Sequence, residues 1–142
     1  MVRHSIGSLT PQRAHTRPCG TRGVEGDEAY AERAWKEAEA FANLDSWGHY
    51  QYIDNNKPAE ALAICYDWMY DWLSDAQKEK IVGALRKNHL DTIYDLLENP
   101  NASKYQPSFY RFYFLSNNHA LLDNTGTFMS ALAIADTDPD YA

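Results

Sequence analysis

The chain has 142 residues, of which 44% are hydrophobic and 13% aromatic; this is enough apolar material for one folded domain and argues against disorder of the whole. The formal net charge of −7 argues against nucleic acid or an anionic membrane as the main partner, because both need a basic surface. No stretch approaches the ~20 apolar residues of a membrane span, and the Arg-containing start has no apolar run typical of a signal peptide, so localisation stays open.

Residues 1–25 are predicted to be a disordered or non-native leader. They are rich in Arg, Thr, Gly and Pro, show neither helical nor strand periodicity, and give way abruptly to a different composition at Gly26-Asp27. Cys19 and Cys65 lie in segments of very different character, so they predict two free thiols rather than a disulfide or a metal site. We expect no metal and no cofactor.

The remainder, residues 26–142, is predicted to be all-α. Apolar residues recur at three- and four-residue intervals over 27–43, which indicates a first amphipathic helix. A polar and aromatic connector over 45–56 follows, and Pro58 is expected in the first turn of a second helix over about 58–73. That helix is apolar around most of its circumference, and its aromatic residues are interpreted as core: Tyr66, Trp68, Tyr70 and Trp72.

Ser74 and Gln77 form a capping-box pattern that predicts the start of a third helix, ending before Asn99-Pro100. Its inner face is expected to carry Ile81, Val82, Leu85, Ile93, Leu96 and Leu97. An aromatic-rich loop over about 98–115 precedes a fourth helix, which should begin near Ser116 or Asn117 and end by Asp136. This fourth helix carries Leu121, Leu122, Phe128, Met129 and Leu132.

The last five residues, 138–142, repeat the pattern of residues 27–31 and predict the first turn of a fifth helix with Pro139 at its start. The pattern as a whole favours antiparallel helical hairpins. Such hairpins bury their apolar faces against the next hairpin in the array. The chain is therefore expected to be a truncated piece of a longer helical array.

Three segments carry a resemblance to a known family: GDEAYAERAWKE, ALAICYDWMYDWLSDAQKEKI and SNNHALLDNTGTFMSALAIADTDPDYA. Through them, residues 26–142 resemble the N-terminal helical domain of heparinase II/III-type polysaccharide lyases, which include related alginate lyases. The resemblance implies a partial (α/α) toroid, which in the family continues into further helices and β-sandwich domains. It also implies β-elimination at a uronic acid of an acidic polysaccharide, without a redox cofactor.

The same resemblance places a catalytic role on Asn118 and His119, with Asn117 beside them in substrate binding. In the family, an asparagine and a histidine neutralise the substrate carboxylate, so that the C5 proton becomes acidic enough to leave. Amide and imidazole N–H donors at the start of a helix suit an anion. The alternative is that the asparagine only caps the helix and that the histidine is structural or merely exposed.

Aromatic and basic residues of the two connectors are candidates for substrate binding, because sugars stack on aromatic faces and Arg holds carboxylates by paired hydrogen bonds. These candidates are Trp47, His49, Tyr50, Tyr110, Arg111 and Tyr113. The alternative is that the aromatics fill the layer between helices. Asp123, four residues after His119, either orients the imidazole or is only a solvated acid.

The family's tyrosine base lies downstream of the histidine, in a region that this chain does not reach. We therefore expect the chain alone to be inactive, because the proton needs an acceptor. The competing hypothesis is a non-catalytic helical-repeat scaffold that binds glycan or protein through its aromatic connectors.

Overall fold

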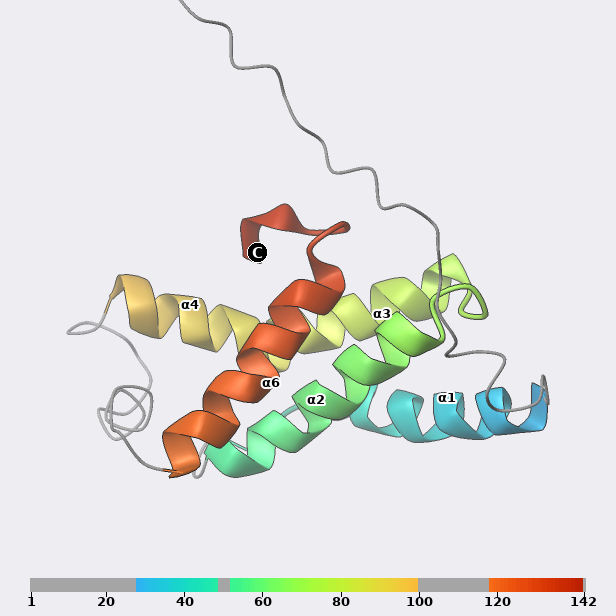
Figure 1. The fold of residues 1–142 in the computed structure, drawn as a ribbon, viewed down its shortest axis with the longest axis horizontal. Helices are drawn as coiled ribbons and strands as arrows, with labels where there is room; N and C mark the ends of the chain where they lie inside the picture. The colour runs from blue at the N-terminus through green and yellow to red at the C-terminus, as the bar shows by residue number, and fades with distance from the viewer. Residues whose placement is uncertain (1–27, 49–51, 100–117, 142) are drawn as a thin grey trace, which may run out of the picture.

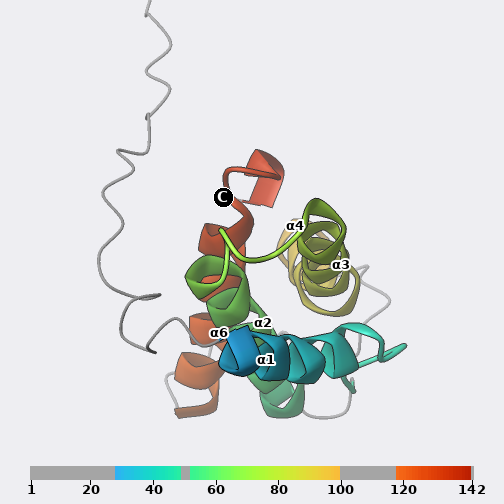
Figure 2. The same ribbon diagram turned by 90° about the vertical axis from the view of Figure 1, so that its right-hand side faces the viewer.

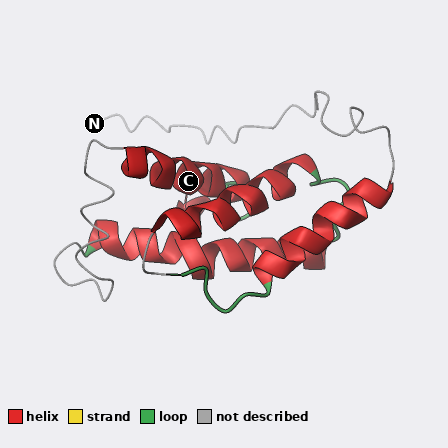
Figure 3. Ribbon diagram, turned by 90° about the horizontal axis from the view of Figure 1, so that it is seen from below, coloured by secondary structure: helices red, strands yellow, loops and turns green. Residues whose placement is uncertain are grey.

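The computed structural model describes residues 28–48, 52–99 and 118–141. In these ranges the backbone forms helices and turns, with no strand (Figure 3). This confirms the predicted all-α class. None of the described helices has both the length and the apolar character needed to cross a bilayer. The predicted leader over 1–25 and nearly all of the aromatic loop over 98–115 lie outside the described residues.

The described α-helices have between 8 and 17 residues, and Figure 1 shows how they are arranged. In chain order they are α1 (Glu28–Ala42), α2 (Tyr52–Trp68), α3 (Asp75–Leu85), the π-helical turn η1 (Arg86–Leu90), α4 (Asp91–Glu98), α6 (Asn118–Ile134) and the 3-10 turn η2 (Pro139–Tyr141). The bounds of α1 and α6 agree closely with the helices predicted over 27–43 and up to Asp136. Pro139 opens a turn as expected, although that turn is a 3-10 helix.

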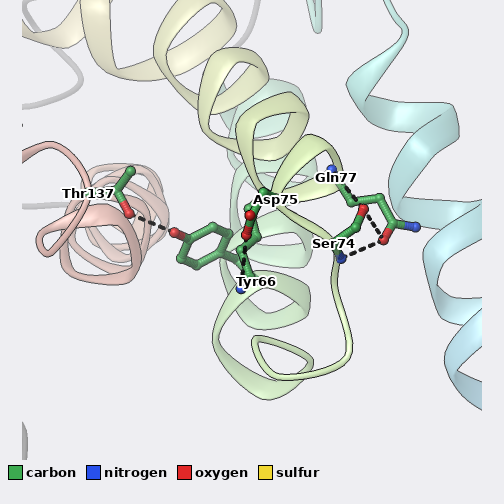
Figure 4. A network of polar contacts seen from close by, with 6 residues as sticks. Tyr66, Ser74, Asp75, Gln77 and Thr137 are labelled. Atoms are coloured by element: carbon green, nitrogen blue, oxygen red, sulfur yellow. Dashed lines mark hydrogen bonds and ion pairs between the residues drawn. The ribbon is translucent and has the colours of Figure 1, made fainter.

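The start of α3 is capped as the sequence predicts. The Ser74 hydroxyl accepts from the backbone N–H of Gln77 at 3.4 Å, and the Gln77 side-chain oxygen accepts from the backbone N–H of Ser74 at 2.8 Å (Figure 4). Two N–H groups that the helix cannot pair internally are thereby satisfied.

The predicted bounds of the second helix were wrong, because α2 begins at Tyr52 and places Pro58 inside the helix. A proline within a helix removes one backbone hydrogen bond and crowds the preceding turn. Here tertiary contacts of that turn offset the loss: the Asn55 side chain donates to the carbonyl of Asn88 at 2.8 Å. At its other end α2 stops at Trp68, and Leu73, predicted to be helical, lies buried in the turn that follows.

The third predicted helix is interrupted by η1, which the apolar periodicity did not indicate. In this turn the backbone N–H of Asp91 donates to the carbonyl of Arg86, five residues earlier, instead of four. Because the pitch changes in this turn, it alters which residues of the following helix, α4, face the core. Ile93 and Leu96 are buried as expected, but Leu97, predicted on the inner face, is 53% exposed.

The most extensive helix contact joins α2 and α6, which run side by side in the same direction (Figure 1). Asn56, in the second turn of α2, lies against Gly126 in the middle of α6, and near the end of α2 the Tyr66 hydroxyl meets the hydroxyl of Thr137, just after α6, at 2.7 Å (Figure 4). The continuous α3–η1–α4 rod runs in the opposite direction and packs beside this pair (Figure 2).

The face that α6 turns towards the interior is made of small residues, which lets the two helices approach closely. Its buried small members are Ala120, Gly126 and Ser130, and the larger Ile134 is buried at the end of the helix. The large apolar residues of α6 point the other way: Leu121, Phe128 and Leu132 are between 67% and 69% exposed. The described core therefore lies between α2, α3 and η1, closed by Ile134, and one apolar side of α6 is left uncovered.

Candidate functional site

The predicted catalytic pair lies in the first turn of α6. Asn118 is the first residue of this 17-residue helix and is exposed, while Ala120 is buried. No acidic side chain occupies the first turn, so the unpaired backbone N–H groups there leave a favourable environment for an anion. The backbone of His119 belongs to this turn, but its side chain, like that of Asp123, is outside the description.

Most of the predicted substrate-binding residues lie outside the described residues, so their position relative to Asn118 stays a prediction. They are Asn117, His49, Tyr50, Tyr110, Arg111 and Tyr113.

Trp47 is described, and its environment favours packing over sugar stacking. Its side chain is 6% exposed and belongs to the buried core. The indole N–H donates to the backbone carbonyl of Phe41 at 2.9 Å, which satisfies its one polar group. Gly48, at φ 90°, turns the chain directly after it. A sugar could stack on this ring only if the surrounding core opened.

The aromatic series that runs from α2 into the turn after it is only partly core. Tyr66 is buried as predicted and contacts the ring of Tyr70 edge-on, at 5.4 Å between centroids. Trp68 is 64% exposed, so its assignment to the core was wrong; Trp72, at 36%, is also exposed. Residues two apart on a helix point to nearly opposite sides, so Tyr66 and Trp68 could not both face α6.

The structure instead places a buried polar cluster where α2, η1 and α6 meet. His89, on η1, is fully buried, with its Nδ1 3.1 Å from Oδ1 of Asn55 and its Nε2 3.0 Å from the hydroxyl of Thr127. The amide of Asn55 in turn donates to the carbonyls of Asn88 at 2.8 Å and Gly48 at 3.4 Å. Three helical segments are thus joined through one imidazole.

The hydrogen-bond donors and acceptors around His89 determine which of its ring nitrogens carries the proton. Because the Asn55 amide nitrogen is used on two carbonyls, its oxygen faces Nδ1 and can only accept. Nδ1 therefore carries the proton, and Nε2 accepts from the Thr127 hydroxyl. Burial lowers the pKa of His89 from 6.5 to about 4, so the ring is neutral near pH 7.

Three further polar side chains on α2, α4 and α6 are buried, each with an oxygen that has no partner among the described residues. These oxygens belong to Asn56, Thr92 and Ser130. The amide nitrogen of Asn56 donates to Glu60 at 3.0 Å, while its oxygen lies against Gly126. Buried polar oxygens without a partner are costly, which is why an apolar core would ordinarily be expected here.

The cluster can hold a neutral imidazole in one orientation, but it does not resemble a metal centre. Within the described ranges no group of three His, Cys, Asp or Glu residues is placed to hold a metal ion. The remaining reactive group, Cys65, is half-buried with its sulfur 3.7 Å from that of Met69, and burial raises the pKa of its thiol.

Sequence reasoning missed this cluster although a signal was present. His89 is four residues from both Leu85 and Ile93, which were assigned to the inner face, so the same periodicity predicts a buried histidine. Asn55 and Asn56 were assigned to a connector because Pro58 was interpreted as the start of the helix. A polar pair one turn before a proline gave no reason to expect burial.

In comparisons with known proteins, no protein-family model and no curated protein matched the chain.

Proposed function

We propose that this chain is the helical part of a polysaccharide lyase that cleaves a uronic-acid-containing polymer by β-elimination. The observation that carries the proposal is the first turn of α6, where Asn118 is exposed, His119 follows it in the helix and no acidic residue is present. An anion is favoured there by the helix dipole and by N–H groups that the helix itself does not use.

The proposed chemistry assigns one role to this turn. Asn118 and His119 donate hydrogen bonds to the uronate carboxylate, so that charge developing on it after loss of the C5 proton is stabilised. The base that takes the proton, and the acid that protonates the departing O4 oxygen, belong to parts of the site beyond these two residues. The chain alone is therefore expected to bind substrate without cleaving it.

The arrangement of the helices supports a toroid of antiparallel hairpins as the setting of this site. Successive rods reverse direction in Figure 1, and α2 and α6, two steps apart, run parallel. The exposed apolar side of α6, with Leu121, Phe128 and Leu132, suits a further helical layer packed against it.

The test is an NMR titration of the chain with a short uronic-acid oligosaccharide, using a neutral oligosaccharide of equal length as control. We expect shifts of the backbone amides at residues 118–121 with a Kd on the order of 1 mM, because a few exposed donors bind weakly. Asn118→Ala should remove these shifts. Asn43→Ala, at an exposed asparagine in the turn after α1, should leave them unchanged.

Equal shifts with the neutral sugar, or shifts that survive Asn118→Ala, would rule out carboxylate recognition at this turn. A parallel assay follows ultraviolet absorbance of the unsaturated uronate product with alginate, heparin, heparan sulfate and chondroitin sulfate. It should stay flat, and product formation that disappears in His119→Ala would show that the chain already contains a complete site.

A non-catalytic helical scaffold is the second candidate, and the exposed apolar side of α6 favours it equally. Such a surface is typical of contact with another protein. The two candidates differ in the titration, because a scaffold of this kind gives no uronate-dependent shift at residues 118–121.

A further inference from the structure

The segment from Asp138 to Tyr141, here named the clasp, folds back from the end of α6 onto the α3–η1–α4 rod (Figure 2). Asp138 forms an ion pair with Arg86 at 2.8 Å, and the Tyr141 hydroxyl donates to the Asp91 carboxylate. The Arg86 guanidinium also lies over the Tyr141 ring, 5.2 Å from its centroid, and Tyr94 packs edge-on against the same ring at 4.8 Å.

Arg86 and Asp91 are the residues whose backbone groups close the π turn of η1. The N–H of Asp91 donates to the carbonyl of Arg86, so the two lie one above the other. In an α-helix, residues five apart are separated by about 140° around the axis and point away from each other. The π turn is therefore what allows both side chains to reach the same tyrosine.

The inward side of this turn carries His89. Its imidazole is held by Asn55 of α2 and Thr127 of α6, and it is buried completely. The clasp contacts one side of η1, and Asn55 and Thr127 contact His89 on the other side. Both sets of contacts thus depend on the same five-residue turn. A change of pitch in that turn alters the direction of both.

We propose that the clasp is a latch: while it is docked, it holds η1 in the π turn and keeps His89 on Asn55 and Thr127. Release of the clasp lets the turn relax towards the more stable α-helical pairing, which rotates its residues by roughly a quarter turn and withdraws the imidazole. Movement at the surface near Tyr141 is in this way coupled to the buried junction of three helices. This inference does not depend on the proposed lyase function.

The charges around the clasp support a docked ground state. Burial and the hydrogen bond to Asp91 raise the pKa of Tyr141, so the hydroxyl stays protonated and remains a donor. The hydrogen bond of Tyr141, together with the negative charge of Asp138, raises the pKa of Arg86, so its positive charge is retained. In the docked clasp, the neutral Tyr141 thus lies between the positively charged Arg86 and the carboxylate of Asp91.

The test uses the whole chain with Tyr141→Ala, which removes the ring and hydroxyl of the clasp. Its control is Tyr94→Phe, which removes a hydroxyl from the adjacent ring and leaves the clasp contacts in place. Two quantities are measured by NMR: the ring nitrogen shifts of His89, which report its tautomer, and hydrogen exchange of the Asp91 amide, which reports the π turn.

Tyr141→Ala should average the two His89 tautomers and raise exchange of the Asp91 amide by about ten-fold or more, while Tyr94→Phe changes neither. Retention of both signals in Tyr141→Ala would overturn the latch. If that variant does not fold, Tyr141→Phe, which keeps the ring and loses only the hydroxyl with its hydrogen bonds to Asp91 and Arg86, should produce the same changes to a smaller extent, and unchanged signals in it would overturn the proposal as well.

A reverse measurement separates coupling from simple loss of packing, because coupling between two sites is reciprocal. Thr127→Val removes the hydroxyl that donates to His89 and does not touch the clasp. It should raise hydrogen exchange of the Tyr141 amide, which donates to the carbonyl of Asp138 at 3.3 Å. No change at Tyr141 would mean that the two sides of η1 are independent.

Discussion

His89 ties pH to stability because it is neutral in the folded chain and ionisable in the unfolded one. Its pKa falls from 6.5 to about 4 on burial, so between these values only the unfolded chain binds the proton. The free energy of unfolding contributed by this group is fully present above pH 6.5. It is lost as pH falls towards 4, by about 3 kcal/mol in total.

We therefore expect His89→Gln to be less stable than the parent chain near pH 7 and to show a shallower decline between pH 6.5 and 4. Urea denaturation followed by circular dichroism at half-unit pH steps measures both curves, and their difference isolates His89 from carboxylates that titrate in each. Parallel curves across this window would contradict the assignment of a buried neutral imidazole.

For single residues, the sequence predicts which side chains are buried better than it predicts which residues they contact. The spacing of Leu85, His89 and Ile93 indicates an inward histidine, but nothing local indicates that Asn55 and Thr127 come to meet it. Those contacts join residues 34 and 38 positions apart and depend on how three helices are placed. Trp68 illustrates the reverse error, since its apolar character predicted the core and its position on the helix prevents it.

Among the helices, α6 requires a glycine at one position, Gly126. A Cβ at Gly126 would lie 1.6 Å from Oδ1 of Asn56, a side chain that is buried and cannot swing aside. At Gly83, in the last turn of α3, a Cβ would meet nothing within 4 Å. The two glycines thus allow opposite predictions from the same substitution.

Gly126→Ala should destabilise the chain by about 1–3 kcal/mol, because the added methyl forces α2 and α6 apart. Gly83→Ala should stabilise it by about 0.5–1 kcal/mol, because alanine is the better helix former. Chemical denaturation measures both, and adding Asn56→Ala to Gly126→Ala should recover part of the loss. Equal effects of the two single changes would show that the close contact of Asn56 with Gly126 is not present.

Helix starts and stops were predicted well where the signal is local and poorly where it is tertiary. The capping box of Ser74 and Gln77 depends on residues three apart, and it is present as expected. The early start of α2 and the π turn depend on contacts of Asn55 and of Arg86 with distant segments. Pro58 led to a wrong start for the second helix, because the preference of proline for the first turn stabilises less than those contacts do.

For the whole molecule, the uncovered side of α6 predicts association. Leu121, Phe128 and Leu132 are exposed on a helix whose only charged residue is Asp123, so a contact through these residues would bury mainly apolar surface.

Phe128→Gln with Leu132→Gln should reduce concentration-dependent association in sedimentation velocity, while unfolding free energy changes by no more than about 0.5 kcal/mol, because both sites are largely exposed. Glu32→Gln, on the polar side of α1, is the control and should leave association unchanged. Association that persists in the double variant would place the contact elsewhere on the surface.

The all-α class could be predicted at this scale from signals within the helices themselves: apolar periodicity in the first, a capping box at the start of the third, and apolar residues around most of the second. The candidate site could be predicted only as a position on the chain: Asn118 lies at an exposed helix start as expected. The convergence of that turn with the aromatic connectors is a property of distant segments, and it stays a prediction.

The parallel pairing of α2 with α6 also determines when the chain can fold. Tyr66 and Thr137 are 71 positions apart, so closing that contact costs about 4 kcal/mol of chain entropy before it is repaid. During synthesis at about 5–20 residues per second, α2 leaves the ribosome several seconds before its main partner exists. For that interval a helix that is apolar around most of its circumference has only α1, and later α3, to cover it. We therefore expect nascent chains arrested before residue 118 to bind holdase chaperones, and chains whose residues 1–142 have all left the ribosome to be released.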